Sequence, residues 1–314
     1  MKTKVFIDGS AGTTGLQIFE RLGKRDDIEI ITLSDEMRKD TEARREAINA
    51  SDVTFLCLPD AAAVEAVSLA GDKVRIIDAS TAHRTNPAWD YGFPELSAAH
   101  REAIAKSKRV ANPGCYASGF ISLVYPLMKA GVLPEDYPLT AHAVSGYSGG
   151  GKKMIAALEG ADKSKEMYSP RQYALTQSHK HLPEMQKVCG LKYKPMFNPI
   201  VDDYYAGMVV SVPLVTRALG KAYSPADIHE ILSAHYEGQR FVKVMELGGK
   251  DTLPDGFLAA NTLEGTNDMQ LFVFGSDEQI LLCSRLDNLG KGASGAAVQN
   301  MNIMLGLDET TSLI

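Results

Sequence analysis

The sequence is poor in the features that mark several large classes of protein. Its four cysteines, Cys57, Cys115, Cys189 and Cys283, are far apart in 314 residues and form no CxxC pair, so neither a disulfide framework nor a cysteine-rich zinc site is indicated. The 33 lysines and arginines are outnumbered by 39 acidic residues, which argues against a basic surface for nucleic acid. No apolar run approaches the ~18 residues of a membrane-spanning helix.

The N-terminal residues also lack the marks of a secretory signal. The opening stretch MKTKVFIDGSAG enters a strand-like run at once, without the long apolar segment and small-residue cleavage site of a signal peptide. We therefore expect a cytoplasmic protein with neither nucleic acid nor membrane as a partner. The hydrophobic content of 45% and the charged content of 23% are those of a globular protein, and 314 residues suit two domains.

Residues 1–115 alternate short β-branched runs with amphipathic helical stretches. The runs expected as strands are 4–7, 28–33, 53–58, 74–79 and 109–111. Helices are expected between them, including 41–50 and a helix over 60–70 for which Asp60, after Pro59, would be the N-cap. This alternation predicts a Rossmann-like, doubly wound α/β domain with a parallel sheet.

Residues beyond Cys115 have a different pattern. We expect an apolar helix over 118–130, a strand over 208–215, a helix over 224–236 and a hairpin of 270–274 with 279–283. Strands that follow one another without alternation predict a second α+β domain carrying a largely antiparallel sheet. The tail, 292–305, is expected to be helical, with Ala297, Met301 and Met304 on one face.

A glycine-rich turn follows the first expected strand. Its residues are Gly9, Ser10, Ala11, Gly12, Thr13, Thr14 and Gly15. Glycines allow a tight turn and let backbone N–H groups approach a pyrophosphate, while the N-terminus of the next helix favours negative charge. Three glycines alone could be a plain strand–helix turn, but their place at the start of an alternating α/β domain favours a dinucleotide site.

The end of the second expected strand should meet the adenosine ribose of such a cofactor. A hydroxyl and two cations stand there, Ser34, Arg38 and Lys39, and would hold a 2′-phosphate. Asp35 or Glu36 could instead bind a 2′-hydroxyl and favour NAD. The local sequence leaves both open, and we favour NADP.

Cys115 differs from the other cysteines in its surroundings. Asn112-Pro-Gly-Cys115 ends the fifth expected strand with a turn, and an apolar helix begins just after it. A cysteine at a helix N-terminus has its thiolate stabilised by free N–H groups and by the helix dipole. Ligands of open α/β sheets bind at the carboxyl ends of the strands, where Cys115 would lie. A small residue tolerated at a helix start is the plainer interpretation.

The segment His179-Lys180-His181-Leu-Pro-Glu184 offers the base that a nucleophilic cysteine needs. Two histidines stand two residues apart, and a carboxylate follows that could orient one of them. The same residues could simply be a solvated helix start. A metal site is not favoured, because no further Cys/His cluster with ligand spacing accompanies them.

An acyl-phosphate substrate would need cationic groups, because phosphate prefers arginine forks and exposed N–H groups. Arg84, which follows the fourth expected strand, is well placed for this in the topology. Lys152 and Lys153 are further candidates, and any of the three could be an ordinary surface charge.

These segments together resemble N-acetyl-gamma-glutamyl-phosphate reductases, in the short form of this arginine-biosynthesis family. The resemblance covers essentially the whole chain. It is carried by the glycine turn at 9–15, Asp78-Ala-Ser80 with Arg84, Tyr91-Gly-Phe-Pro-Glu-Leu96, Asn112-Pro-Gly-Cys-Tyr-Ala117, Ser145-Gly-Tyr-Ser-Gly-Gly150, His179-Lys-His-Leu-Pro-Glu184 and Asn288-Leu-Gly-Lys-Gly-Ala-Ser-Gly295. The combination of NPGCYA with HxHxPE is specific, whereas the glycine turn is not.

The resemblance implies how the chain is divided into domains and what each domain does. Residues 1–114 with 288–314 would form an NADP-binding Rossmann domain that the C-terminal helix completes. Residues 115–287 would form a catalytic and dimerisation domain of a homodimer or homotetramer. Cys115 would be the nucleophile and His179 its acid–base partner.

The resemblance also implies which side chains meet the ligands, with no metal among them. Substrate contacts would come from Arg84, Ser145, Gly146, His181 and Glu184. Cofactor contacts would come from Gly9, Ser10, Ala11, Gly12, Thr13, Thr14, Gly15, Ser34, Arg38, Lys39, Ser80, Asn288, Gly290, Lys291 and Gly292.

The expected chemistry is reduction of an acyl phosphate to an aldehyde through a thioester on Cys115, with release of phosphate. Aspartate-semialdehyde dehydrogenase shares this plan, but the HxHxPE segment argues against it. A different acyl group on the glutamyl phosphate, such as succinyl, stays open. A non-catalytic dinucleotide sensor would not need both Cys115 at a helix start and the paired histidines.

Overall fold

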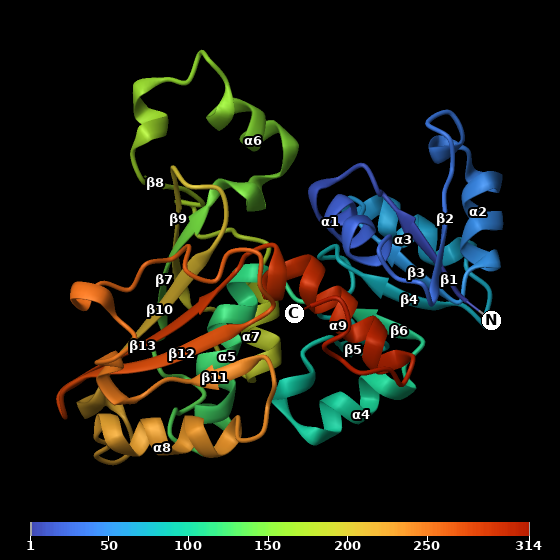
Figure 1. Cartoon of the computed structure of the whole chain (residues 1–314). Coiled ribbons are helices and arrows are strands. Elements are labelled where there is room, and N and C mark those ends of the chain that lie inside the picture. The colour runs from blue at the N-terminus through green and yellow to red at the C-terminus, as the bar shows by residue number, and fades with distance from the viewer. Residues whose placement is uncertain (1, 314) are drawn as a thin grey trace. The chain divides into compact units, whose positions relative to one another are not determined.

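A computed structural model describes residues 2–313 of the chain (Figure 1). They fall into two compact units: the chain up to Gly114 together with the segment from Ala293 onward, and Cys115–Gly292. Residues 288–292, which the resemblance places in the cofactor domain, group with the second unit. The reason is local: the Asn288 side chain accepts a hydrogen bond from the Gly207 backbone N–H and donates one to Ser148 Oγ.

The first unit is built on a parallel sheet whose strand order is β2-β1-β3-β4-β6-β5. Its strands are β1 (Thr3–Asp8), β2 (Ile28–Ile31), β3 (Val53–Leu56), β4 (Arg75–Asp78), β5 (Asp90–Tyr91) and β6 (Arg109–Ala111). The expected Rossmann-like fold is confirmed. The short strand β5 was not expected, because two residues carry no periodic signal.

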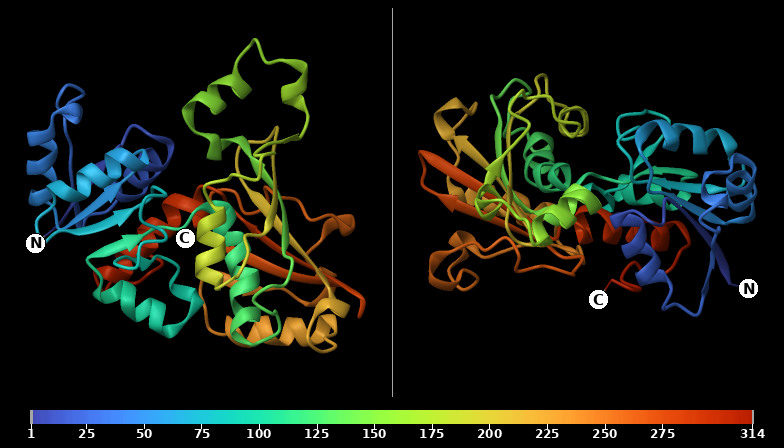
Figure 2. Two further views of the ribbon diagram at one scale, coloured as in Figure 1. Left: turned by 180° about the vertical axis from the view of Figure 1, so that it is seen from behind. Right: turned by 90° about the horizontal axis from the view of Figure 1, so that it is seen from above.

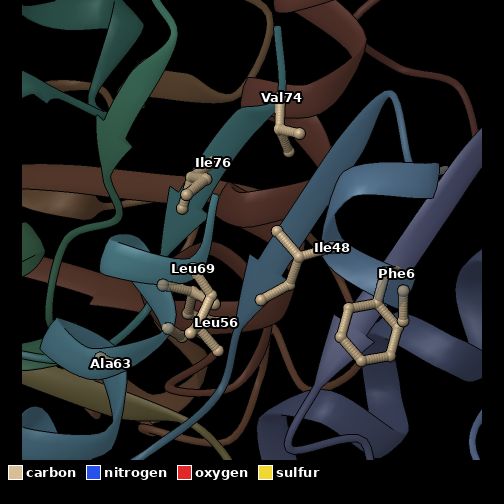
Figure 3. Packing of buried hydrophobic residues seen from close by; sticks show 9 residues of the cluster. Phe6, Ile48, Leu56, Ala63, Leu69, Val74 and Ile76 are labelled. Carbon is tan, nitrogen blue, oxygen red and sulfur yellow. The ribbon is translucent and has the colours of Figure 1, made fainter. Parts of the chain in front are cut away.

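Helices cover this sheet. They are α1 (Thr13–Leu22), η1 (Met37–Lys39), α2 (Thr41–Ala50), α3 (Asp60–Leu69), η2 (Pro94–Leu96), α4 (Ala98–Lys106) and α9 (Gly295–Met304). Figure 3 shows how strand and helix side chains interdigitate; Phe6, Leu56 and Ile76 from the sheet meet Ile48 and Leu69 from the helices. Burial of such side chains stabilises the unit by about 1.5–3 kcal/mol each.

One local expectation in this unit is wrong. Asp60 is not the N-cap of α3; Pro59 occupies that position, and the Asp60 carboxylate instead accepts hydrogen bonds from the backbone N–H and hydroxyl of Thr81. Helix α9 is buried on every side: all ten of its residues are buried, including Ala297, Met301 and Met304, the residues expected on one face. Its polar residues are tolerated inside because they find partners: Asn300 donates to Gly92 O, and Asn302 accepts from Arg25.

The second unit has a mixed, largely antiparallel sheet of order β11-β12-β13-β10-β7-β9-β8, as expected. Its strands are β7 (Thr140–Gly146), β8 (Arg171–Gln172), β9 (Met196–Asp202), β10 (Met208–Val215), β11 (Val242–Val244), β12 (Met269–Gly275) and β13 (Gln279–Leu286). The expected hairpin is the β12–β13 pair, with Met269 opposite Leu286.

Helix α5 (Cys115–Lys129) packs against β10 and β13 of this sheet, with α7 (Leu182–Cys189) and α8 (Pro225–His235) beside it (Figures 1 and 2). The remaining elements are α6 (Gly151–Glu159), the short 3₁₀ turns η3 (Tyr147–Gly150), η4 (Lys165–Tyr168), η5 (Thr216–Ala218), η6 (Leu247–Gly249) and η7 (Pro254–Gly256), and the π-helical turn η8 (Gly290–Ser294). Over residues 2–313, no helix combines the length and the apolarity needed to cross a membrane.

Candidate active site

The glycine turn between β1 and α1 has the geometry of an anion cradle. Gly9 has φ +87°, a conformation that disfavours any side chain, and a Cβ on Gly15 would lie 2.5 Å from Gly9 O. Gly12 is the N-cap of α1 and brings no side chain to cap it. The first N–H groups of α1 are therefore left without a side-chain acceptor, as in sites that receive a phosphate.

A neighbouring hydroxyl fits the same interpretation. Thr13 Oγ1 is buried and has no hydrogen-bond partner among the residues that the structure describes. A buried polar atom of this kind calls for a ligand or a water molecule. The turn and this hydroxyl fit the pyrophosphate of a dinucleotide.

The loop after β2 carries the expected ribose-binding residues. Ser34 accepts a weak hydrogen bond from the Met37 N–H on Oγ, and its carbonyl accepts one from the Arg38 N–H. Arg38 forms an exposed ion pair with Asp35, at 2.9 Å. Asp35, one of the two acidic residues that could have favoured NAD, is therefore paired with a cation, although such surface pairs contribute little energy.

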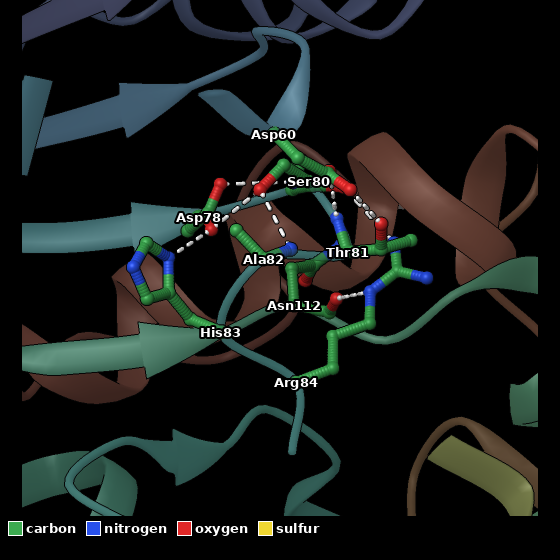
Figure 4. A network of polar contacts seen from close by, with 9 residues as sticks. Asp60, Asp78, Ser80, Thr81, Ala82, His83, Arg84 and Asn112 are labelled. Atoms are coloured by element: carbon green, nitrogen blue, oxygen red, sulfur yellow. Dashed lines mark hydrogen bonds and ion pairs between the residues drawn. The ribbon is translucent and has the colours of Figure 1, made fainter. Parts of the chain in front are cut away.

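The carboxyl end of β4 carries a dense polar network (Figure 4). The buried Asp78 carboxylate accepts hydrogen bonds from the N–H and hydroxyl of Ser80 and contacts Nδ1 of His83 at 2.6 Å. The His83 ring stacks on Trp89 with centroids 4.1 Å apart. The Ser80 hydroxyl, expected at the cofactor, thus donates its proton within the network.

Arg84 belongs to the same network. Its Nε donates to Asn112 O and its Nη2 to Ala79 O, each at 2.9 Å. The guanidinium therefore links the chain after β4 to the chain after β6, three residues before Cys115. Asn112 is held further by its own side chain, which donates to Ala293 O.

Cys115 begins α5 and is half-buried, and the other three cysteines are held as thiols. Burial raises the pKa of Cys57 to about 12, with help from the charges of Asp78 and Asp8. Burial also raises the pKa of Cys283 to about 11 and that of Cys189 further still. Because the thiolate is the nucleophile, Cys115 is the cysteine suited to attack a substrate.

The last segment of the second unit packs directly on Cys115. A Cβ added to Gly292 would lie 2.7 Å from the Cys115 Cβ and 3.0 Å from Asp287 O. Neighbouring Lys291 is buried, with its ammonium 5.8 Å from the centre of the Phe241 ring. A Cβ on Gly290 would lie against Thr266 O. Within the second unit the backbone at Gly292 therefore packs against the first residue of α5.

Two tyrosines lie beside Cys115. The Tyr173 hydroxyl donates to the Tyr116 hydroxyl at 3.0 Å. Burial raises the pKa of Tyr116 well above its usual range, with further contributions from Tyr173 and the Cys115 charge. Burial likewise raises the pKa of Tyr173 to about 12, partly offset by the Tyr116 bond and reinforced by Cys115. Both phenols stay protonated near the thiolate.

His179 and His181 join these tyrosines in one aromatic cluster. The His179 ring packs on His181, Phe197, Tyr116 and Tyr173, with centroids 4.7, 5.1, 5.9 and 6.0 Å apart. The His181 backbone N–H donates to His179 Nδ1 at 3.1 Å. A backbone N–H can only donate, so a neutral His179 carries its proton on Nε2.

The other expected substrate residues lie in the same unit. His181 and Glu184 are buried at the start of α7, and Ser145 is buried at the end of β7, where its hydroxyl donates to Gly146 O. Ser145 also hydrogen-bonds to Tyr116. Lys180 is exposed, and so are Lys152 and Lys153 on α6.

The structure thus gathers Cys115, His179, His181 and Ser145 in the second unit, and it places the glycine turn, Ser34, Arg38, Ser80 and Arg84 in the first.

Sequence reasoning did not select Tyr116, Tyr173 or Gln177. A tyrosine next to the nucleophile was the available signal for Tyr116. Tyr173 and Gln177 carried none, because β8 and the segment after it are too short and irregular for a periodic pattern. Among residues 2–313 there is no group of three or more His, Cys, Asp or Glu side chains that could hold a metal.

Comparison with known families decides the assignment. The profile described as semialdehyde dehydrogenase, NAD binding domain, matches residues 4–107, and that described as semialdehyde dehydrogenase, dimerisation domain, matches residues 115–288. The chain belongs to the semialdehyde dehydrogenase family. It is therefore an oxidoreductase with a nicotinamide dinucleotide cofactor.

Curated relatives narrow the branch of the family. The chain is 49% identical over 320 residues to N-acetyl-gamma-glutamyl-phosphate reductase 2 of Nostoc sp., covering 99% of each chain. It is 51% identical over 306 residues to N-acetyl-gamma-glutamyl-phosphate reductase of Burkholderia lata, covering 96% of each. The resemblance found in the sequence motifs is confirmed.

Solved structures show the same fold at low identity. Aspartate semialdehyde dehydrogenase II from Vibrio cholerae matches with a TM-score of 0.70 and 17% identity, over 98% of this chain and 99% of that one. Aspartate semialdehyde dehydrogenase from Francisella tularensis matches with a TM-score of 0.72 and 16% identity, over 96% and 100%. These likenesses establish the semialdehyde dehydrogenase architecture and no more.

Proposed function

We propose that the chain reduces N-acetyl-L-glutamyl 5-phosphate to N-acetyl-L-glutamate 5-semialdehyde with NADPH, in arginine biosynthesis. The observation that carries the proposal is the cluster at the start of α5. There Cys115, half-buried at the first position of the helix, lies beside two tyrosines that contact His179. The relatives at about half identity bear the name of this activity.

The first step is attack of the Cys115 thiolate on the acyl carbon. A C–S bond forms, the bond from that carbon to the phosphate oxygen breaks, and phosphate leaves with the electron pair. Backbone N–H groups of the first turn of α5 can stabilise the oxyanion of the tetrahedral intermediate, because no residue of the same helix precedes them to accept their hydrogen bonds. The acyl group is then a thioester on Cys115.

His179 moves the proton that the reaction consumes. Its Nδ1 is engaged by the His181 N–H, so Nε2 carries the transferable proton and can give it to the departing phosphate. When bound, the reduced nicotinamide supplies the hydride that takes the thioester to the aldehyde level. Collapse of the resulting thiohemiacetal anion breaks the C–S bond and returns the Cys115 thiolate.

For the cofactor we propose NADP. Ser34, Arg38 and Lys39 supply a hydroxyl and two exposed cations after β2, the groups that suit a 2′-phosphate. The glycine turn and Thr13 Oγ1 would hold the pyrophosphate. Replacement of Arg38 and Lys39 by Ala should raise KM for NADP at least tenfold and leave KM for NAD nearly unchanged.

The reaction is best tested in reverse, as phosphate-dependent reduction of NADP by N-acetylglutamate 5-semialdehyde. We expect turnover that requires phosphate and is faster with NADP than with NAD. N-succinylglutamate semialdehyde and aspartate semialdehyde serve as the matched alternatives. Faster turnover with either of them would show that this other semialdehyde is the substrate and would contradict the proposed N-acetylglutamate 5-semialdehyde.

We also propose that the chain works in the cytoplasm as a homodimer or homotetramer. The family profile over residues 115–288 is described as a dimerisation domain. In support, a hollow of about 730 Å³ lies in the second unit, and its lining includes the apolar residues Val144, Val209, Phe274 and Leu281. Light scattering should show an oligomer that Leu281→Lys weakens; a monomeric native chain would contradict the proposal.

A further inference from the structure

The segment that joins β8 to α7 carries two members of the aromatic cluster described above, and two of its other residues have an unfavourable backbone conformation. Tyr173 stands at its start and His179 at its end. Between them Ala174 has φ 51° and Gln177 has φ 56°. This left-handed region is disfavoured for residues with a Cβ, and such conformations persist only where the surroundings hold them.

The side chain of Gln177 makes the hydrogen bonds that keep the segment in this conformation. Its Nε2 donates to Phe197 O and its Oε1 accepts from the Phe197 N–H, both at 2.8 Å. The amide thus pairs with the main chain of β9 as a neighbouring strand would. The segment has two more fixed points: the Tyr173 N–H donates to Pro199 O, and the Gln177 N–H donates to Ala174 O.

Phe197, whose main chain is hydrogen-bonded to Gln177, is itself part of the aromatic cluster. The Phe197 ring lies 5.1 Å from His179 and 5.2 Å from Tyr116, centroid to centroid. Phe197 is almost fully buried and cannot easily move. Gln177 therefore fixes the segment to the same residue against which the imidazole packs.

We propose that Gln177 is a positioning residue: by pairing with the Phe197 main chain, it holds the His179 imidazole and the Tyr173 hydroxyl in place beside Cys115. The proposal rests on the proposed function in that His179 is the proton donor. Gln177 would act through these two residues, by way of its hydrogen bonds to Phe197. Without the pairing, the two left-handed residues would relax and both ends of the segment would move.

The test compares Gln177→Ala with Gln172→Ala in the full chain. Gln172 also hydrogen-bonds to β9, through Asn198 Oδ1 at 3.0 Å, but it does so on the surface and outside this segment. We expect Gln177→Ala to lower kcat roughly 10- to 100-fold with KM values changed less than about twofold, because a small misplacement of a catalytic group is costly. Gln172→Ala should match the native chain. Equal activity of the two variants would overturn the proposal.

Gln177→Glu adds a readout that a merely structural role would not move. An ionised carboxylate can accept from the Phe197 N–H but repels Phe197 O, whereas a protonated carboxyl restores both hydrogen bonds. The ratio of the variant's kcat to the native kcat should therefore rise as pH falls from about 8 toward about 5. A ratio that does not change with pH would contradict the proposal, even if the alanine variant failed to fold.

Alkylation of Cys115 by iodoacetamide separates this proposal from the proposed function, because it needs no substrate. Loss of a fixed imidazole and hydroxyl beside the thiolate should move the rate profile of Gln177→Ala to higher pH than that of Gln172→Ala. If the native chain oxidised none of the semialdehydes with NADP and phosphate, the proposed function would fail, yet this shift would still support Gln177. Superimposable profiles would overturn the role of Gln177 by themselves.

Discussion

At the scale of single residues, burial decides which side chains can react. Cys57, Cys189 and Cys283 have raised pKa values because their thiols are desolvated, whereas Cys115 starts a helix. The sequence allowed this distinction, since a turn and an apolar helix flank Cys115. It could not show that Arg84 is engaged by two backbone carbonyls, because its partners Ala79 and Asn112 directly follow strands that meet only in the folded sheet.

Arg84→Ala tests whether that arginine is structural. Its removal leaves two carbonyls without charge-assisted donors, so we expect the free energy of unfolding in urea to fall by about 2–3 kcal/mol. Arg45→Ala, which removes an exposed arginine paired with Glu42, should cost less than about 1 kcal/mol. Unchanged stability of Arg84→Ala with a raised KM for phosphate would instead favour the substrate contact that the resemblance implies.

At the scale of elements, the long periodic segments were predictable and the short ones were not. Helices α2 and α8 and the β12–β13 hairpin lie where periodicity and turn residues indicated. Strands β5 and β8 have two residues each, and the π-helical turn η8 replaces the start of the expected last helix. The backbone of η8 closes on Cys115, a contact between positions far apart in the chain that no local pattern encodes.

Gly292→Ala tests that contact. The new methyl group would stand 2.7 Å from the Cys115 Cβ, closer than side chains pack, so the thiol must shift. We expect kcat to fall at least about tenfold while the Kd for NADP, measured by fluorescence titration, stays within about twofold. Gly220→Ala, where a Cβ meets open space, is the control. A weakened Kd with normal kcat would show that Gly292 serves the cofactor instead.

At the scale of the whole molecule, both units carry buried groups that must stay neutral. Cys57 is in the first unit and Cys283 is in the second; burial raises the pKa of their thiols from 9.0 to about 12 and about 11. The two-domain plan itself could be predicted from length and from the change of pattern at Cys115. The pKa values could not, because they depend on tertiary burial.

These groups predict a loss of stability in alkali. A folded-state pKa above the unfolded value means that the folded chain retains protons that the unfolded chain releases, so the stabilisation is complete below pH ~9 and is lost as pH rises through about 11–12. The urea midpoint should therefore fall steeply between pH 9 and pH 11. Cys283→Ala should make the slope shallower; a midpoint independent of pH in this range would contradict the assigned burial.

The central claim is that Cys115 carries the acyl group, and a single-turnover experiment without phosphate tests it most directly. The chain is mixed with N-acetylglutamate 5-semialdehyde and NADP, NADPH absorbance is followed, and the acid-quenched protein is examined by mass spectrometry. We predict a burst of about one NADPH per chain and an acyl adduct on the peptide that contains Cys115, both absent in Cys115→Ser. A burst without an adduct, or a burst that survives in Cys115→Ser, would contradict the thioester mechanism.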